Sequence, residues 1–435
     1  MSGQPCVGIF DANYASTLAV VRSLARIGAP FKVYHHHKRC VSALSRYVDE
    51  VRPSPFLDDY TRFPDWLNRQ LDAGEFDLIM PTSDVVCFHI ANTLDRIDPA
   101  IAAHYPTRDA YLDVLFKDRF ALRCNALGLP TPLTYEPKSL DEALAAAETL
   151  GYPVLLKPRS HVLMRHFRGQ VVNSPEQMRQ HFAPYEPPPV EAAVLKDYPD
   201  MVWPLVQEFI PRVKQQMSGS GVIGQNGQPL AANATIKVDQ SPSFMGTGIA
   251  FADANHSGFA EFASRGAAQL LGHGLFELEA LSRPGDEEPL LIDVNPRVFL
   301  QMEFDLARGS DLPALWYQDL CGQPPAPPAE KSCPVWIDPA PLLVTYATRI
   351  ITGPHRWFFL KRLGKLLRYT RAVSAFDWRD LLASIGCFVW TIRYPQTFIR
   401  PHIREAKTAH APIETPNQAS GGATPRAPTN PDQRS

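Results

Sequence analysis

Short apolar runs alternate with amphipathic segments in the first part of the chain. The run CVGIF at 6–10 is followed by a polar turn and then by LAVVRSLARIG at 18–28, whose apolar residues recur at helical spacing. A further run begins at residue 31, and FDLIM at 76–80 leads into another polar turn and helix. Continuous apolar runs are typical of strands that are covered on both faces. The pattern predicts a doubly wound α/β domain over residues 1–115.

A second group of elements is expected over residues 116–321. The segment KDRFALRCNALG at 117–128 predicts a helix that ends at Gly128, because glycine suits the left-handed conformation that often follows a helix. The remaining apolar runs predict strands with mixed α+β character. These strands are expected within GYPVLLK, WPLVQEFIP, ANATIKV, GLFELEAL and LLIDVNPR.

Acidic residues share one face of the last two predicted strands. Glu277 and Glu279 alternate with apolar residues, and Asp293 and Asn295 do the same. Pairing of the two strands sets Glu279 opposite Asp293 and Asn295, and such hard oxygen ligands suit Mg²⁺, or Mn²⁺ in its place. We expect Glu277 to stay outside the metal ligands. Arg297, further along the same face, is expected to hold an anion with its planar fork.

Three lysines supply the complementary charge. Lys157 ends an apolar strand, Lys117 begins the predicted helix, and Lys237 lies in the strand ANATIKV. Each of them alone is also compatible with a solvated surface. Together with the acidic residues they indicate a site for a polyphosphate and its metal, where phosphoryl transfer depends mainly on positioning and charge neutralisation.

The order of these segments resembles the ATP-grasp superfamily over roughly residues 5–320. The chain is similar to ATP-dependent carboligases, to carboxylate-amine ligases and to the large chain of carbamoyl-phosphate synthase. The resemblance implies a pre-ATP-grasp domain over 1–115 and an ATP-grasp domain over 116–321. It also implies ATP and Mg²⁺ as cofactors and an acyl phosphate as the intermediate.

The resemblance assigns roles to individual residues. Lys117 and Lys157 match lysines that contact ATP phosphates, and VQEFIP matches the hinge at which the backbone of Glu208 and Ile210 contacts adenine. Lys237 is expected on the nucleotide and, with Arg297, on the reacting groups. The expected metal ligands are Glu279, Asp293 and Asn295.

Two departures from the family pattern are visible. Asp293 stands where the family usually has glutamate, which is one methylene longer. The loop after the second lysine is usually rich in glycine, but here it reads RSHVLMRHFRGQ, with Gly169 alone. Arg165, His166 and Arg168 are candidates to hold phosphate there through side chains.

The expected activity is therefore that of an ATP-dependent ligase that joins a small-molecule carboxylate to an amine. Two alternatives stay open. One is a non-catalytic regulatory or scaffold protein with a degenerate ATP-grasp fold, and the other is a carboxylase of the same fold that uses bicarbonate. A dinucleotide site is not expected, because the turn at 11–15 lacks the required glycines.

The last part of the chain differs in composition. Residues 322–342 are rich in proline and predict a linker or an extended segment that wraps over the protein, because such a run cannot sustain a helix. Residues 353–371 hold six Lys/Arg and no acid and predict a basic amphipathic helix, with Lys361, Arg362, Lys365 and Arg368 opposite Leu363, Leu366 and Leu367. The region 322–402 is thus expected to be a linker with a helical appendage that either contacts a membrane peripherally or docks on protein. A disordered tail is expected over 403–435.

Composition excludes several other classes. The net charge of −2 shows no chain-wide basic surplus, so no nucleic-acid partner is expected. Seven scattered cysteines without a CxxC pair favour a reducing cytoplasm over a disulfide framework or a zinc site. The basic helix would then touch the inner face of the membrane. The histidines at 35–37 are expected to be solvated, because neighbours in a strand point to opposite faces.

Overall fold

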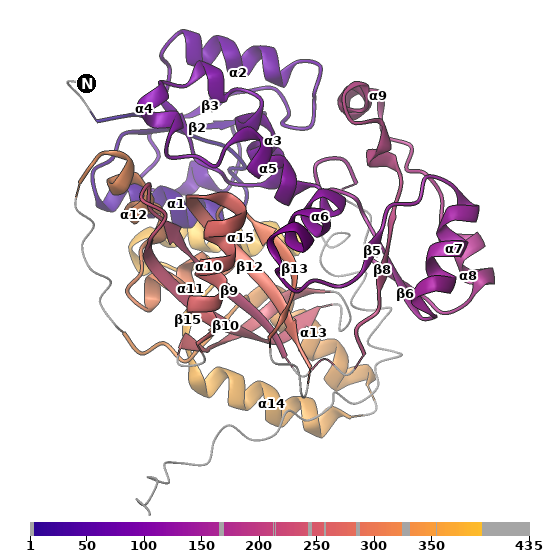
Figure 1. Cartoon of the computed structure of the whole chain (residues 1–435). Coiled ribbons are helices and arrows are strands. Elements are labelled where there is room, and N and C mark those ends of the chain that lie inside the picture. The colour runs from indigo at the N-terminus through magenta and orange to yellow at the C-terminus, as the bar shows by residue number, and fades with distance from the viewer. Residues whose placement is uncertain are drawn as a thin grey trace, which may run out of the picture.

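The computed structural model describes residues 4–164, 169–211, 213, 215–241, 246–255, 258–283, 288–323, 331–353 and 355–393. Within these residues the strands form three sheets (Figure 1). One sheet belongs to the N-terminal domain, a second forms a small lobe, and the third is a large sheet of seven strands. Mixed α/β and α+β architecture was predicted from the sequence, and the structure confirms it.

The N-terminal sheet is parallel throughout, in the order β3-β2-β1-β4. Gly28, at φ 67°, follows the first helix, and the Ser83 hydroxyl accepts the Val86 N–H to cap α3. The doubly wound domain predicted from continuous apolar runs is therefore present. Its elements are β1 (Val7–Ile9), α1 (Ala15–Arg26), β2 (Phe31–His35), β3 (Val51–Pro53), α2 (Phe63–Asp72), β4 (Leu78–Ile79), α3 (Asp84–Ala91), α4 (Pro99–Ala102) and α5 (Arg108–Leu115).

The small lobe carries an antiparallel sheet in the order β5-β8-β6-β7. Helices α7 and α8 pack together beside it, at the right of Figure 1. The lobe is joined to the N-terminal domain through α6 (Lys117–Leu127), which ends at Gly128 in the left-handed conformation. Its elements are β5 (Thr134–Tyr135), α7 (Leu140–Leu150), β6 (Val154–Lys157), β7 (Gln170–Val172), α8 (Pro175–His181), α9 (Pro189–Ala192) and β8 (Leu205–Glu208).

The large sheet has the order β13-β12-β9-β10-β11-β14-β15. Helix α10 (Phe259–Leu271) packs closely on β9 at Gly219, where an added Cβ would lie 2.1 Å from the Cβ of Ala263. Glycine there lets the helix approach the sheet. The strands are β9 (Gln215–Ile223), β10 (Pro229–Ser241), β11 (Thr247–Asp253), β12 (Gly274–Ser282), β13 (Leu290–Asn295), β14 (Val335–Ile337) and β15 (Thr370–Val373).

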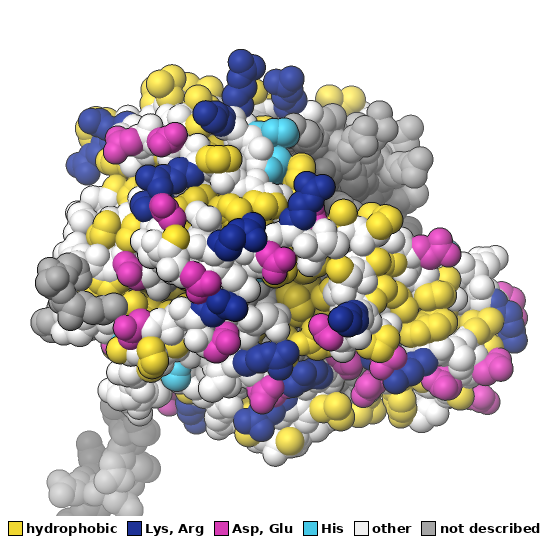
Figure 2. Space-filling view, turned by 90° about the horizontal axis from the view of Figure 1, so that it is seen from above, with side chains coloured by type: hydrophobic (Ala, Val, Ile, Leu, Met, Phe, Trp, Pro, Cys, Tyr) yellow, Lys and Arg dark blue, Asp and Glu magenta, His cyan; other side chains and the backbone are white. Residues whose placement is uncertain are grey.

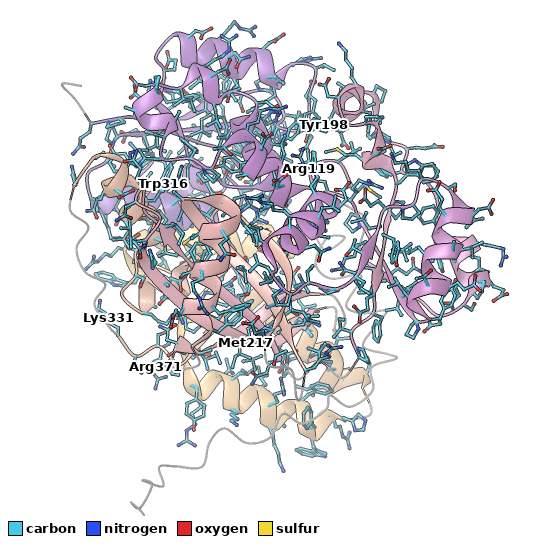
Figure 3. The ribbon with its side chains drawn as sticks, in the orientation of Figure 1. Arg119, Tyr198, Met217, Trp316, Lys331 and Arg371 are labelled. Atoms are coloured by element: carbon cyan, nitrogen blue, oxygen red, sulfur yellow. The ribbon has the colours of Figure 1, made fainter. Side chains whose placement is uncertain are left out.

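Two helices after β13 return the chain to the N-terminal domain. They are α11 (Met302–Ala307) and α12 (Leu312–Leu320), and α12 packs against α1. Trp316 of α12 is buried, and Figure 3 shows it between the N-terminal domain and the large sheet. The Tyr317 hydroxyl donates to the Pro5 carbonyl at 2.8 Å. The two domains therefore share one continuous core.

The prediction that 322–342 cannot sustain a helix is wrong for its last residues. Helix α13 (Pro339–Thr352) begins at Pro339, because the N–H groups of a first turn have no partner within the helix and proline loses nothing there. β14 precedes it and pairs with β11 and β15. The C-terminal region is helical as expected, with α14 (Arg356–Tyr369) and α15 (Leu381–Arg393), and it also supplies two strands of the large sheet. Residues 403–435 lie outside the described residues.

Arg362 does not lie with the exposed cations of α14, as the helical pattern predicted. Its side chain is half-buried, pairs with Asp239 of β10 at 3.3 Å and donates to the Val238 carbonyl at 2.6 Å. Asp239 also accepts from the Tyr346 hydroxyl and pairs with Arg349, both of α13. The negative charge of Asp239 attracts Arg362, so the Arg362 side chain turns inward. Asp239 thereby holds α13 and α14 against β10, two residues from Lys237.

A buried ion pair fastens the end of the described chain to the N-terminal domain. Arg22 of α1 pairs with Asp380 at 2.9 Å, and these side chains are 3% and 1% exposed. Asp380 also accepts from the Ser45 hydroxyl and the Arg46 N–H. Every oxygen of Asp380 thus meets a donor, as a buried charge requires. Among the described helices, none combines the length and the apolar character needed to cross a bilayer.

Candidate active site

Strands β12 and β13 bring the predicted acidic residues together. They pair antiparallel, with Glu279 opposite Asp293 and Glu277 opposite Asn295. The two strands have side chains that alternate between faces, so all four residues project from one face. The sequence predicted the Glu279–Asp293 pair, while Asn295 lies one pair further along, opposite Glu277.

Lys117 meets Asp293 across the site. The Lys117 Nζ lies 2.8 Å from Asp293 Oδ1, and the two side chains are 11% and 25% exposed. Lys117 is the first residue of α6, and its N–H donates to the Arg159 carbonyl, which follows β6. Burial alone would raise the pKa of Asp293, but Lys117 outweighs it and the pKa is lowered. Asp293 is therefore held as a carboxylate.

Lys237 and Gln216 converge on Glu279. The Lys237 Nζ lies 3.6 Å from Glu279 Oε2, and Gln216 Nε2 donates to the same oxygen at 2.7 Å. Lys237 belongs to β10 and reaches Glu279 past the intervening strand β9, where small Ser218 is paired with Glu279. The two opposed carboxylates of the strand pair each have their own lysine.

Lys157 is the last residue of β6 and shares the electrostatic environment of these groups. Its pKa is lowered to about 8, first by burial and then by Lys117, while Asp293 and Glu279 act in the opposite direction. Of the three predicted lysines, Lys117 and Lys237 contact the carboxylates of β12 and β13 directly, and Lys157 interacts with the same charges from the end of β6.

Arg297 bridges the large sheet and the N-terminal domain. Its Nε donates to Asp84 Oδ1 at 2.6 Å, and a second nitrogen donates to Asn295 Oδ1 at 2.8 Å. Burial raises the pKa of Asp84, but Arg297 and His161 outweigh it and bring the pKa to about 2. Burial opposes the charge of Arg297, yet Asp84 raises its pKa overall. The pair stays ionised, and it fixes Arg297 and Asn295 in one orientation.

Glu277 supports Asn295 from the opposite strand. It is 5% exposed and accepts hydrogen bonds from Asn295 Nδ2, at 3.0 Å, and from Gln301 Nε2. Burial and then the neighbouring Glu279 raise the pKa of Glu277 to about 7. Its two oxygens are engaged by amide donors, so its place is behind Asn295.

A small hollow opens among these groups. It is bordered by α3, α5, α6, β13 and the loop after β6. The apolar part of its lining consists of Val114, Leu115 and Val294. The polar lining consists of Asp84, Lys117, His161, Asp293 and Asn295.

Sequence reasoning missed Asp84 and His161 as members of the site. Asp84 follows the carboxyl end of β4, which is where doubly wound sheets bind ligands, so the available signal was its position after a buried strand. His161 lies four residues after Lys157 in the loop that follows β6. Burial and then Lys117 lower its pKa, which favours the neutral imidazole.

The predicted hinge lies at the end of β8. The Glu208 N–H donates to the Leu133 carbonyl at 2.8 Å, and Ile210 is 6% exposed. A nucleotide contact by the Glu208 backbone would therefore use its carbonyl oxygen. Arg165, His166 and Arg168, the candidate phosphate ligands of the loop, lie outside the described residues.

The described residues hold no cluster of three or more His, Cys, Asp or Glu side chains arranged for a metal. This includes the histidines at 35–37. The expectation that they are solvated holds for His37 but is wrong for His35, which is buried and whose ring contacts the His37 carbonyl oxygen, while His36 stacks on Phe56. At the candidate site, Glu279 and Asp293 are two carboxylates beside one amide oxygen.

On the face shown in Figure 2, basic and acidic side chains are interspersed, without a single-sign patch.

Comparison with known proteins finds a short sequence match and a wider similarity in fold. No family model matches the chain. A segment of 74 residues is 38% identical to the carbamoyl phosphate synthase large chain of Methanospirillum hungatei. This match spans 17% of the chain and only 7% of the relative's length.

Several solved structures are similar over most of the chain. The N5-carboxyaminoimidazole synthase of Aspergillus clavatus, in complex with ADP and its ribonucleotide, matches 94% of this chain and 100% of its own, with TM-score 0.59 and 14% identity. An L-amino acid ligase of Bacillus licheniformis matches 74% of this chain and 75% of its own, with TM-score 0.54 and 15% identity.

The third is the biotin carboxylase domain of the Hydrogenobacter thermophilus 2-oxoglutarate carboxylase, in complex with MgADP and bicarbonate. It matches 74% of this chain and 70% of its own, with TM-score 0.57 and 15% identity. At these identities the likeness establishes the fold.

Proposed function

From the ATP-grasp fold that the chain shares with these enzymes, we propose that it is an ATP-dependent ligase that activates a carboxylate for attack by an amine. The observation that carries the proposal is that Lys117 and Lys237 pair with the opposed carboxylates Asp293 and Glu279, with Lys157 interacting with the same charges. Three cations from separate elements around two acids suit a polyphosphate with its metal ion.

The nucleotide would lie between the small lobe and the large sheet. Lys117 and Lys157 would contact the phosphates, and Glu208 and Ile210 at the end of β8 would contact adenine through the backbone. Lys157 is well suited to phosphate because its half-buried position has already removed part of its hydration. A phosphate oxygen would restore the favourable interactions that burial took away.

The donor set fits Mg²⁺. Glu279 and Asp293 present carboxylate oxygens on opposed strands, and Asn295, whose amide oxygen also accepts from Arg297, adds a third oxygen beside them. Mg²⁺ prefers such oxygens and keeps positions for water and phosphate, so a set smaller than a full protein cage is suitable. When bound, the ion would neutralise charge on the phosphates. Lys117 and Lys237 now hold these carboxylates and would pass to the phosphates.

The chemistry would proceed in two steps. A carboxylate oxygen attacks the γ-phosphorus of ATP, the bond from that phosphorus to the bridging oxygen breaks, and ADP leaves. The amine nitrogen then attacks the carbonyl carbon of the acyl phosphate, the carbon–oxygen bond breaks, phosphate leaves, and the nitrogen loses its proton. Arg297, held by Asp84, would orient the acyl phosphate, and Lys237 would balance the transferred charge.

Bicarbonate is a second candidate for the carboxylate. Two of the similar enzymes carry a carboxylating activity in their names, and one of them is in complex with bicarbonate. The same acyl-phosphate logic applies, because bicarbonate is also a poor electrophile until one oxygen becomes a leaving group. A non-catalytic scaffold is disfavoured by the intact set of acids, amide and arginine.

Oxygen tracing tests the proposal. The protein is incubated with ATP, amines and pools of carboxylic acids or bicarbonate labelled with ¹⁸O, and the released phosphate is analysed by mass spectrometry. An acyl phosphate transfers one labelled oxygen to phosphate, with ADP formed only when the acid is present. ADP release that does not depend on any acid, or phosphate without label, would contradict the ligase assignment. Carbon label from bicarbonate in the product identifies the carboxylase.

The lowered pKa of Lys157 gives the site an unusual pH dependence. Below about pH 8 the ammonium is charged and can bind phosphate, and above it the charge is lost. Affinity for an ATP analogue should therefore fall above about pH 8, whereas an ordinary lysine holds its charge to about pH 10. Titration calorimetry between about pH 7 and pH 9 measures this.

The matched variant is Lys157→Arg, because arginine stays charged throughout this range. Its affinity should be flat where that of the wild type falls. Lys138→Arg, at an exposed lysine that pairs with Asp200, should keep the wild-type profile. An equal loss of affinity at high pH in Lys157→Arg would assign the pH dependence to another group.

A further inference from the structure

Helix α14 has a free face that the proposed activity does not use. The helix lies along the lower edge of the molecule in Figure 1, and Figure 3 places Arg371 next to its end. Its inner side is fixed by buried Phe359 and Leu366 and by the Arg362–Asp239 pair. The outward face of the helix carries apolar and basic side chains in separate stripes.

Two stripes run along that face. Trp357, Leu360 and Leu367 form an apolar stripe and are 66%, 46% and 50% exposed. The second stripe is basic and lies beside the apolar one on the helix. It consists of Lys361, Lys365 and Arg368, which are all exposed. Leu367, expected on the apolar face, lies in the exposed apolar stripe, whereas Leu366 of the same predicted face is buried. The segment 353–371 contains no acid.

Helices α13 and α15 also carry exposed apolar side chains. Helix α13 packs against both α14 and α15, and its Leu343 and Ile351 are exposed. The outward residues of α15 are all apolar or small until Arg393, and Leu382, Ile385 and Val389 are more than half exposed. Exposed large apolar side chains gathered in this way mark an interaction surface, since soluble proteins avoid such patches.

We propose that the free face of α14, with the exposed apolar residues of α13 packed beside it, binds peripherally to an anionic lipid surface. An interface between lipid and water accommodates both stripes at once, with Trp357 and the leucines at the acyl boundary and the lysines on acidic headgroups. Helix α15, with 13 residues or about 20 Å, is too short to cross a bilayer.

Charge disfavours the other occupants. A second copy would place the same basic stripe against itself, and lysine is depleted in the centres of protein interfaces. Residues 394–435 of this chain carry five Lys/Arg and three Asp/Glu, so they do not complement a basic helix. An anionic surface satisfies the cations and the apolar residues together.

Vesicle sedimentation of the full-length protein tests the proposal. The wild type should bind vesicles of phosphatidylcholine and phosphatidylglycerol in a one-to-one mixture and should not bind phosphatidylcholine alone. The variant Lys361→Gln, Lys365→Gln, Arg368→Gln should bind the mixed vesicles about a hundredfold more weakly, since each cation near such a surface contributes about a factor of five. The variant Trp357→Ala, Leu360→Ala, Leu367→Ala should lose at least about tenfold.

A control variant removes three exposed arginines elsewhere, Arg123→Gln, Arg179→Gln and Arg265→Gln, and should bind like the wild type. All substituted side chains are exposed, so unfolding temperatures should be unchanged. The proposal is overturned if the wild type does not bind the mixed vesicles. It is also overturned if the apolar variant binds them fully, which would indicate charge attraction alone, or if light scattering finds a dimer that only the apolar variant disrupts.

Discussion

Replacing Asp293 by alanine should reduce turnover by about a thousandfold, with ADP release as the measurement. The carboxylate pairs with Lys117 at 2.8 Å and faces Glu279 across the strand pair. Its loss would remove a proposed metal ligand and leave the half-buried Lys117 ammonium without a counter-charge. Both effects act where charge develops during phosphoryl transfer, so the rate should fall far more than the stability.

Two further variants make this result specific. Glu288→Ala changes an exposed acid just before β13 and should leave turnover unchanged. The double variant Asp293→Ala, Lys117→Met should be no slower than Asp293→Ala alone, because two residues that act as a unit are not additive. Turnover of Asp293→Ala within tenfold of the wild type would contradict the role given to this strand pair.

Arg22→Ala should lower the free energy of unfolding by about 3–5 kcal/mol. The substitution leaves Asp380 as a buried charge that has lost its ion-pair partner, although Ser45 and the Arg46 N–H still donate to it. Urea denaturation measures the loss. Because Arg22 also donates to the Ala375 carbonyl, the segment between β15 and α15 should become the first site of proteolysis.

The matched control lies one turn away on the same helix. Arg26 pairs with Asp311 at 3.1 Å, but these side chains are 32% and 25% exposed, so Arg26→Ala should cost less than about 1 kcal/mol. The double variant Arg22→Met, Asp380→Asn removes both charges and should be more stable than Arg22→Ala. Equal small losses for Arg22→Ala and Arg26→Ala would show that the buried pair does not fasten the C-terminal region.

The residues of β12 and β13 could be predicted because strand geometry is simple. Glu279 and Asp293 alternate with apolar neighbours, and a period of two fixes the face they share once the strands pair. Lys117 and Lys157 were recognised from the order of motifs along the chain. Local pattern and motif order together were enough to select the residues that the proposal assigns to metal and phosphate.

Contacts between distant segments could not be predicted. Asp84 meets Arg297 from a different domain, and nothing local to Asp84 distinguishes a helix-capping acid from a site residue. The inward turn of Arg362 depends on Asp239, which is 123 residues away. The strand β14 escaped notice because proline-rich flanks outweighed a run of only three apolar residues. Such contacts join residues that are far apart in the sequence, so no periodic pattern in the sequence indicates them.

The central claim is that one triphosphate occupies the space between Lys157 and the face of β12 and β13. A crystal structure with a non-hydrolysable ATP analogue and Mn²⁺, with the ion located by its anomalous scattering, tests it most directly. We expect the manganese peak beside Glu279 and Asp293, with phosphate oxygens on Lys117 and Lys157. A nucleotide bound at another place, with Lys157 turned to water and no metal at Asp293, would contradict the account.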